Sequence, residues 1–350
     1  MPPTEQKALF LLTPGGEFAV RSRSVPSPGA GEILARVDAT ALNPVDWKIH
    51  RHAPDIIQYP GILGTDGAGV VEEVGEGVTH LQKGDRILWQ GMFTNDRATF
   101  QQYTLATAYH VAKLPDSVSV DEAASVPLGL ATAFLGLYNE KKDGQGGGAG
   151  LIPYYKSTKA HEGSPIVVLG GATSVGQYAI QFARLSGFSP IIATASVKHT
   201  EFLKSLGATH VLSRTLPDDA LIAEIRSITS QPVEVVYDAV SHASTQKPGW
   251  SLLAPGGQLV LVLPPAEGIV SGQDGKGVVN VVGNVGYPGQ VEIGRELYAT
   301  LSQLLADGSI KPNRVQLLPE GLAGIPHGLD LMRQEQVSGN KLVVRPQETA

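Results

Sequence analysis

The chain has 350 residues, of which 42% are hydrophobic and 17% are charged, and its formal net charge is −6. At roughly 150 residues per domain, this length indicates two domains, or one large domain with an insertion. The large apolar share excludes disorder over most of the chain. Because the chain is mildly acidic and has no cluster of Lys and Arg, we expect no nucleic-acid partner.

The sequence contains no cysteine. Disulfides, thiolate nucleophiles and every zinc site that depends on Cys are therefore excluded. The first residues, Met1–Lys7, lack the basic and then apolar pattern of a signal peptide. The longest apolar runs are far shorter than the roughly 20 residues that span a bilayer. We expect a soluble, cytoplasmic protein with no membrane partner.

The first third of the chain predicts short β-strands. Residues 34–39 alternate in polarity, residues 69–75 form a strand with a turn, and residues 84–88 begin another strand. Glycine accounts for 41 residues, which indicates many tight turns. This pattern is typical of an antiparallel, barrel-like β domain.

The middle of the chain alternates strands with helices. Residues 165–169 are a continuous apolar run, as expected for a parallel strand that is buried on both faces. Residues 174–185 have apolar side chains at helical spacing. The pattern continues with strands at 190–195, 233–238 and 258–263 and with helices at 201–206 and about 241–253. This alternation predicts a parallel, doubly wound sheet.

Further elements lie on either side of this region. A helix is expected over residues 121–138, and the glycine-rich residues 141–150 that follow are interpreted as a flexible surface insertion. The C-terminal part predicts helices at 296–306 and 322–335 and a final strand at 341–344.

A glycine-rich segment, residues 169–176, leaves a buried strand and opens a helix, which is the context that a dinucleotide-binding fingerprint requires. The match to G-x-G-x-x-G is imperfect, because Thr173 takes the place of the middle glycine. Glycines permit the close approach of a pyrophosphate, and a helix N-terminus supplies unpaired N–H groups. An ordinary glycine-rich turn is the alternative interpretation. The expected cofactor contacts are Gly171, Ala172, Thr173, Ser174, Val175 and Gly176.

The end of the next strand distinguishes between nicotinamide cofactors. NAD-binding folds place an acidic residue about 20 residues after the fingerprint, where it binds the ribose hydroxyls. Here Ser196, Lys198 and His199 follow the strand, and no acid is present. A hydroxyl and a cation suit a 2′-phosphate, so the sequence favours NADP(H) over NAD(H). A solvated first turn of a helix is the alternative interpretation.

Several segments together resemble the medium-chain dehydrogenase/reductase superfamily over about residues 35–344. They are the turns at 61–71, 74–78 and 83–86, the fingerprint, and the ending 337–344. The alcohol dehydrogenases of that superfamily hold zinc with a Cys and a Gly-His-Glu segment. This sequence has Gly64-Thr65-Asp66 there and no Cys. It therefore resembles the zinc-free branch, which contains quinone oxidoreductases and enoyl reductases, and no metal site is expected.

The resemblance is most specific to the fungal trans-acting enoyl reductases, and residues 41–48, 126–133 and 184–188 carry it. It implies a Rossmann-type doubly wound parallel sheet that binds NADP(H), over residues 127–289. It also implies a GroES-like β-barrel catalytic domain formed by residues 1–126 and 290–350.

The resemblance also implies the site residues. Family members place the nicotinamide against an Asn-Pro-x-Asp segment and a Pro-x-Gly-x-x-Thr-Ala helix start, which here supply Asn43, Pro44, Asp46, Lys48 and Thr132. Asp46, Lys48 and Thr132 are the catalytic candidates. Further cofactor contacts are expected from Arg214, Val262, Leu263, Ser338 and Lys341. Arg214 stands where relatives often carry a Tyr, and it would serve the 2′-phosphate.

These expectations together indicate an NADPH-dependent reductase of activated carbon–carbon double bonds. Hydride from the nicotinamide would reach the β-carbon of an α,β-unsaturated carbonyl, and the α-carbon of the resulting enolate would be protonated. Lys48 is the candidate for supplying that proton or polarising the carbonyl, and an exposed lysine without chemistry is the alternative.

The sequence leaves other functions and the assembly open. Quinone reduction is one alternative function, and an NADPH-binding partner protein without turnover is another. The substrate would be a small-molecule or carrier-bound α,β-unsaturated carbonyl compound. The chain would be a monomer, or a homodimer joined through an edge strand at residues 277–282.

Overall fold

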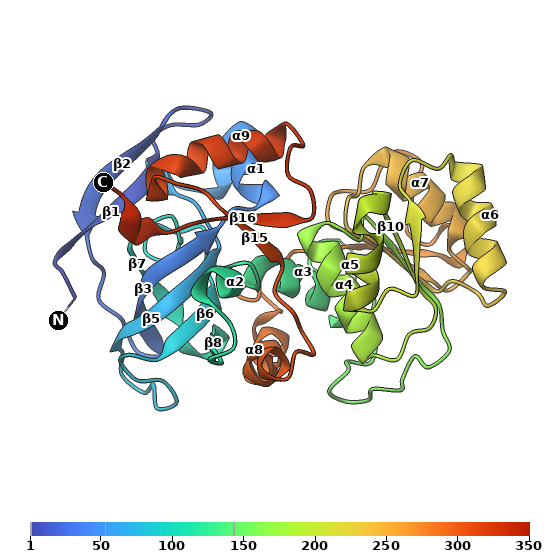
Figure 1. Cartoon of the computed structure of the whole chain (residues 1–350), viewed down its shortest axis with the longest axis horizontal. Helices are drawn as coiled ribbons and strands as arrows, with labels where there is room; N and C mark the ends of the chain where they lie inside the picture. Colours follow the sequence, from blue (N-terminus) through green and yellow to red (C-terminus); the bar gives the residue numbers. More distant parts are fainter. Residues whose placement is uncertain (1, 53, 143) are drawn as a thin grey trace. The chain divides into compact units, whose positions relative to one another are not determined.

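The computed structural model describes residues 2–52, 54–142 and 144–350 (Figure 1). The chain divides into two compact units. Unit 1 comprises Met1–Leu128, Arg295–Gly308 and Pro312–Ala350. Unit 2 comprises Gly129–Gly294 and Ser309–Lys311.

Unit 1 is built on two β-sheets (Figure 1). The larger sheet has the strand order β15 (Arg314–Leu317), β16 (Asn340–Val344), β3 (Glu32–Ala41), β5 (Asp66–Val74), β6 (Arg86–Gln90) and β8 (Val111–Lys113), and β7 (Tyr103–Thr107) also pairs with β3. The smaller sheet has the order β2 (Phe18–Ser24), β1 (Glu5–Leu11) and β4 (Gly61–Ile62). The pairings of β3 with β5, β7 and β16 are antiparallel, which confirms the predicted antiparallel β domain.

Helices complete unit 1. They are α1 (Pro44–His52), α2 (Val120–Ala124), α9 (Ile325–Arg333) and most of α8 (Val291–Ala306). The prediction of one continuous helix over residues 121–138 is wrong, because α2 ends at Ala124 and α3 (Pro127–Tyr138) begins at a proline. Proline has no N–H to donate, and it disfavours the helical conformation in the residue before it, so the two helices separate there.

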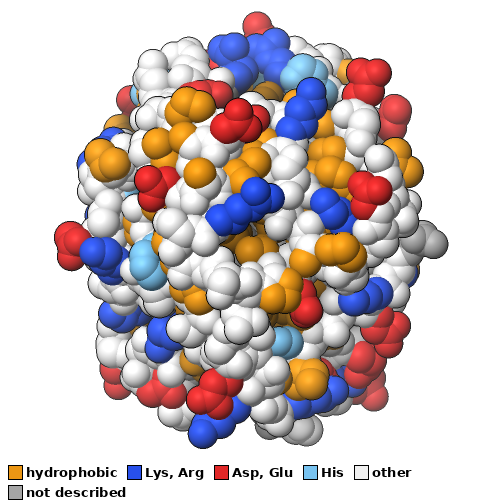
Figure 2. Space-filling view, turned by 90° about the vertical axis from the view of Figure 1, so that its right-hand side faces the viewer, with side chains coloured by type: hydrophobic (Ala, Val, Ile, Leu, Met, Phe, Trp, Pro, Cys, Tyr) orange, Lys and Arg blue, Asp and Glu red, His pale blue; other side chains and the backbone are white. Residues whose placement is uncertain are grey.

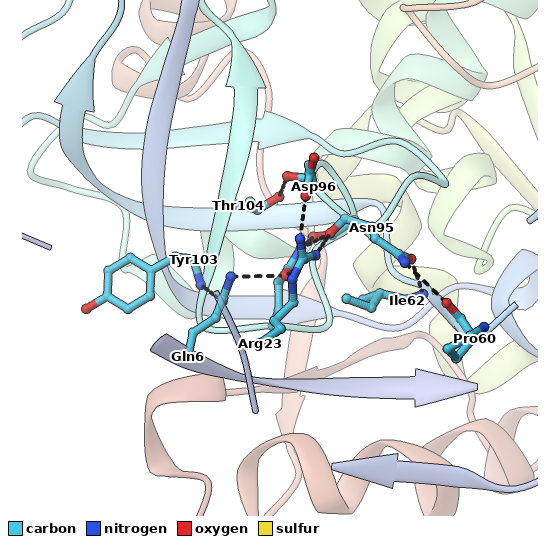
Figure 3. A network of polar contacts seen from close by, with 10 residues as sticks. Gln6, Arg23, Pro60, Ile62, Asn95, Asp96, Tyr103 and Thr104 are labelled. Carbon is cyan, nitrogen blue, oxygen red and sulfur yellow. Dashed lines mark hydrogen bonds and ion pairs between the residues drawn. The ribbon is translucent and has the colours of Figure 1, made fainter. Parts of the chain in front are cut away.

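A polar network in unit 1 fastens the loop between β6 and β7 (Figure 3). Arg23 on β2 contacts the carbonyl oxygen of Asn95 and the carboxylate of Asp96. The Asn95 side chain accepts the Ile62 N–H at 2.9 Å and donates to the Pro60 carbonyl at 3.2 Å. These contacts hold the loop to β2 and β4, the two outer strands of the smaller sheet.

Unit 2 is a parallel sheet, which confirms the predicted doubly wound fold. Its strand order is β11 (His210–Ser213), β10 (Ile191–Ala195), β9 (Ile166–Leu169), β12 (Val235–Asp238), β13 (Gln258–Leu261) and β14 (Gly277–Asn280). The chain moves outward from β9 to β11 and then returns to the other side of β9 at β12. This reversal is the switch point at which open sheets of this kind bind ligands.

Helices cover both faces of this sheet. They are α3, α4 (Ser174–Leu185), α5 (Thr200–Leu206), α6 (Asp218–Ile228) and α7 (Ala243–Leu252). Gly136 of α3 lies against Tyr237, whereas Gly249 of α7 lies against Val236. Because consecutive residues of a strand point to opposite faces, α3 and α7 lie on opposite sides of β12.

Part of the glycine-rich insertion is ordered against the edge strand β14. The Gly146 N–H donates to the Asn280 carbonyl at 2.9 Å, and the Asn139 amide donates to the Gly146 carbonyl at 2.7 Å. Residue 143 of the predicted flexible insertion lies outside the described residues.

The surface carries charges of both signs. On the face drawn in Figure 2, Lys and Arg side chains alternate with Asp and Glu side chains, and hydrophobic side chains lie between them. Such charges largely cancel beyond a Debye length of about 10 Å. Among the described residues, no helix has both the length and the apolar character needed to cross a membrane.

Candidate functional site

The glycine-rich turn between β9 and α4 has the geometry of a phosphate cradle. Thr173 caps α4, and its hydroxyl oxygen accepts the Gly176 N–H at 3.0 Å. A Cβ at Gly176 would collide with the backbone of Gly170, so only glycine allows this close approach of helix and strand. Helix geometry leaves the N–H group of Val175, in the first turn, without a partner inside the helix. These residues fit the pyrophosphate of a dinucleotide.

The residues predicted to contact a 2′-phosphate follow two neighbouring strands. Ser196 follows β10, and Arg214 follows β11, where its N–H donates to the Ala195 carbonyl at 2.9 Å. Lys198 and Arg214 are exposed, whereas His199 is only 7% exposed. The structure therefore brings Ser196 and Arg214 to one edge of the sheet, and it buries most of His199.

Other predicted residues lie on the same carboxyl edge of unit 2. Val262 and Leu263 directly follow β13. Thr132 on α3 is 8% exposed, and its carbonyl accepts the Tyr237 hydroxyl at 2.8 Å. A Cβ at Gly283 would collide with the Thr132 side chain, so this threonine packs against the segment after β14.

Unit 1 buries an ion pair beside the start of α1. The Asp66 carboxylate accepts a hydrogen bond from the Asn43 amide at 2.8 Å and pairs with the Lys341 ammonium at 3.0 Å. The Lys341 ammonium also donates to the Asn43 side-chain oxygen. Each of these side chains is at most 4% exposed. We call Asn43, Asp66 and Lys341 the buried triad.

The buried triad joins segments that are far apart in the sequence. Asn43 precedes α1, Asp66 begins β5, and Lys341 lies in β16. The second carboxylate oxygen of Asp66 accepts the Leu128 N–H, in the first turn of α3, at 2.6 Å. A buried carboxylate is tolerated only when its oxygens are paired and hydrogen-bonded, and here both are.

Asp46, a predicted catalytic residue, is fully buried in α1. Its carboxylate accepts the N–H groups of Asn43 at 2.8 Å and of Gly64 at 3.2 Å. Burial raises the pKa of Asp46 to about 7, and the negative charge of Asp66 also raises it. The two N–H groups and the Lys341 ammonium lower the pKa and so oppose this rise. In this position the side chain holds the start of α1.

Lys48 lies on the same helix and is half-buried. Its ammonium lies 5.7 Å from the centre of the Trp47 ring, within the range of a cation–π contact. Burial lowers the pKa of Lys48, which makes its proton easier to donate. Pro44 is the exposed first residue of α1, and Ser338 lies just before β16.

Comparison with known proteins establishes the family. Residues 29–116 match the alcohol dehydrogenase GroES-like domain, and residues 174–293 match the zinc-binding dehydrogenase family. The chain is 31% identical to the trans-enoyl reductase resD of Aspergillus sclerotiorum, and the match covers 97% of this chain and 99% of that protein. It is 33% identical to a trans-enoyl reductase of Gibberella fujikuroi, with 96% and 98% covered. The chain belongs to the trans-enoyl reductase family.

Solved structures support this assignment at the level of the fold. A thermostable alcohol dehydrogenase from Pyrobaculum aerophilum superposes with a TM-score of 0.74 at 25% identity, over 98% of this chain and 100% of that one. The predicted combination of a Rossmann-type sheet with a GroES-like domain is thereby confirmed. Enoyl reductases of this superfamily bind a nicotinamide cofactor.

In this member of the trans-enoyl reductase family, two residues of the Gly64-Thr65-Asp66 segment bond to other side chains of the protein. Asp66 pairs with Lys341, and the Gly64 N–H donates to Asp46. Over residues 2–52, 54–142 and 144–350, no group of three or more His, Cys, Asp or Glu side chains could hold a metal ion.

Sequence reasoning missed the role of Asp66 in this reductase. Lys341 is predicted to bind the cofactor, yet its ammonium is buried against Asp66 and Asn43. One feature of the sequence could have indicated this role: Asp66 is acidic, and it stands at the position where zinc-dependent relatives carry Glu. Its partner was not evident, because Lys341 is distant in the sequence.

The Lys341→Met substitution leaves the buried Asp66 carboxylate without its counter-charge. We expect the free energy of unfolding to fall by about 3–5 kcal/mol. Asp66→Asn combined with Lys341→Met removes both charges and should recover part of that loss. Urea denaturation of the single and double variants measures both effects. Lys204→Met is the matched control, because its ion pair with Glu201 is exposed; an equal loss in this control would contradict the prediction.

Asp46 should make stability depend on pH. Its pKa rises from an ordinary value of 3.8 to about 7 in the folded protein, so the folded state binds this proton more tightly than the unfolded state. The stability that this proton contributes is therefore complete below about pH 4 and lost as the pH rises through 7. Asp46→Asn should flatten this decline in urea denaturation between about pH 4 and pH 7. The exposed Asp116→Asn variant should keep the wild-type slope.

Proposed function

We propose that this chain is an NADPH-dependent enoyl reductase, which reduces activated carbon–carbon double bonds without zinc. The observation that carries the proposal is the nearly full-length similarity to trans-enoyl reductases, at 31% and 33% identity. The cradle between β9 and α4, in which Gly176 lets the start of the helix approach the end of the strand closely, supports cofactor binding.

In this proposal, unit 2 supplies most of the cofactor site. The turn 171–176 would hold the pyrophosphate, and Ser196, Lys198 and Arg214 would hold a 2′-phosphate. His199, Val262, Leu263, Ser338 and Lys341 stay predictions as cofactor contacts. The cofactor domain would span residues 127–289, and residues 1–126 and 290–350 would form the substrate domain. When bound, the nicotinamide supplies the hydride that adds to the β-carbon of the substrate.

The remaining chemistry falls to the side chains of the protein. Lys48 would donate a hydrogen bond to the substrate carbonyl or supply the proton for the α-carbon, and its lowered pKa supports either role. The buried triad fixes the start of the helix that carries Lys48. Thr132 would line the site, while Asp46, being buried, would act by holding α1 in place.

The substrate would be an α,β-unsaturated carbonyl compound, either free or attached to a carrier. The location would be the cytoplasm. We propose a monomer, because Gly146 of the insertion occupies a backbone acceptor at the end of edge strand β14; a homodimer is the alternative.

The direct test follows the loss of reduced-nicotinamide absorbance with a panel of enones, enoyl thioesters and quinones. Turnover of enones or enoyl thioesters supports the proposal. Turnover of quinones alone would identify a quinone oxidoreductase instead. Tight NADPH binding without turnover of any acceptor would identify a binding partner without catalytic activity.

Lys48→Ala should lower kcat by about 100-fold, because proton transfer or carbonyl polarisation by a positioned side chain contributes on this scale. The KM for NADPH should stay unchanged, since this side chain lies outside the proposed phosphate contacts. Lys156→Ala removes an exposed lysine from unit 2 and serves as the control. Steady-state kinetics that show wild-type kcat for Lys48→Ala would remove Lys48 from the mechanism.

The wild-type protein should prefer NADPH to NADH. Replacing both Lys198 and Arg214 with Ala removes two exposed cations from the proposed 2′-phosphate site and should raise the KM for NADPH by about tenfold or more. The KM for NADH should change little. Parallel titrations with the two cofactors measure the ratio, and a wild-type preference for NADH would refute the assignment.

A further inference from the structure

A buried polar network lies in unit 2 where β12 ends. Asp238, the last residue of β12, is fully buried, and its carboxylate accepts the N–H groups of Val240 at 3.0 Å and Ser241 at 2.7 Å. The Thr245 hydroxyl donates to the other carboxylate oxygen at 2.7 Å. Burial raises the pKa of Asp238, and these donors oppose the rise. The carboxylate thereby holds residues 238–241 in a tight turn.

Ser241 has an unusual backbone conformation within this turn. Its φ is +58°, in the left-handed region that residues other than glycine rarely adopt. The Ser241 hydroxyl donates to the Asp238 carbonyl at 2.6 Å and accepts the Val262 N–H at 2.9 Å. Glycine would adopt this φ without strain, but it could not make these contacts. The hydroxyl thus joins the end of β12 to the residue that follows β13.

Gln246 on α7 extends the connection between these two segments. It is 1% exposed, and its amide donates to the Ser241 carbonyl at 2.8 Å and to the Pro264 carbonyl at 3.0 Å. Its side-chain oxygen accepts the Ala266 N–H at 2.7 Å. We call Asp238, Ser241 and Gln246 the Ser241 network. It fixes the turn after β12 to the segment 262–266 after β13.

The Ser241 network lies at the switch point of the sheet. The Ala239 N–H donates to the Leu169 carbonyl, at the end of β9, at 2.9 Å. A Cβ at Gly170 would collide with the Val240 side chain, so the turn after β12 packs directly against the glycine-rich turn after β9. In open parallel sheets, dinucleotides bind at the carboxyl ends of the strands on either side of this reversal.

We propose that Ser241 is a positioning residue of the cofactor site, which holds the turn after β12 and the segment after β13 in the arrangement that binds the nicotinamide dinucleotide. The inference rests on the proposed binding of NADPH to unit 2. Ser241 acts through the backbone of Asp238 and Val262, and it need not touch the reacting atoms. A site that is already ordered before binding loses less conformational entropy on binding, so the network increases cofactor affinity.

Two variants at this position separate its hydroxyl from its backbone conformation. Ser241→Ala removes both hydrogen bonds and keeps a residue that disfavours positive φ. Ser241→Gly also removes them, but it permits that φ without strain. We expect the dissociation constant for NADPH to rise about tenfold in Ser241→Ala and by a smaller factor of about three in Ser241→Gly. The KM for the enoyl substrate should stay within about twofold of the wild type.

Ser251→Ala is the matched control, because the Ser251 hydroxyl donates to the Lys247 carbonyl at 3.1 Å on the exposed side of the same helix, α7. Its NADPH affinity should equal that of the wild type. Titration of NADPH fluorescence measures binding without turnover, and thermal unfolding in the absence of cofactor measures stability separately. Ser241→Gly keeps the test usable where Ser241→Ala fails to fold.

The possible results are distinct. Weaker NADPH binding by Ser241→Gly, and by Ser241→Ala where that variant folds, supports the inference when the control is unchanged. Wild-type affinity in Ser241→Gly overturns it, whether or not thermal stability falls, because the bridging hydroxyl is then not needed for binding. A wild-type protein that binds neither NADPH nor NADH overturns the proposed function together with the inference.

Discussion

The position of α1, the helix in unit 1 that carries the proposed catalytic residue Lys48, depends on the ion pair between Asp66 and Lys341. Removing two charges from water is costly, and the cost is offset here because the Asn43 amide and the Leu128 N–H complete the hydrogen bonding of the carboxylate. These groups come from β16, β5, the residue before α1 and the start of α3. The pair can therefore form only when the strands of unit 1 are assembled, and it then fixes where α1 begins. Lys48 takes its position from that helix.

In unit 2, side-chain oxygens accept backbone N–H groups at the carboxyl edge of the sheet. Thr173 caps the helix after β9, and Asp238 caps the turn after β12, so buried or partly buried side chains satisfy the backbone where each strand ends. Parallel pairing places these turns side by side. In the proposed reaction the cofactor contributes the hydride, while the protein contributes pre-ordered turns, a hydrogen-bonded helix start and a half-buried lysine.

The central strands of unit 2 were predictable, because β9 and β13 are buried on both faces and therefore appear as continuous apolar runs. The strands β2 and β15 were not predicted. Most of their side chains are at least partly exposed, and polar residues such as Arg21, Arg23 and Arg314 obscure the alternation. The break between α2 and α3 was missed as well, although Pro127 was its visible cause. Among the site residues, the glycine turn was recognisable because its function depends on local backbone geometry.

The sequence by itself determined the absence of thiolate ligands, the glycine-rich strand–turn–helix segment and the alternation that specifies a doubly wound sheet, since each is a property of composition or of neighbouring residues. Only the tertiary structure decided that Lys341 pairs with Asp66 and Asn43, that the pKa of Asp46 rises to about 7, and that Ser241 joins two strand ends in a left-handed conformation. Burial and contacts between separate segments of the chain set these properties. No local pattern in the sequence indicates which distant side chain pairs with a buried charge.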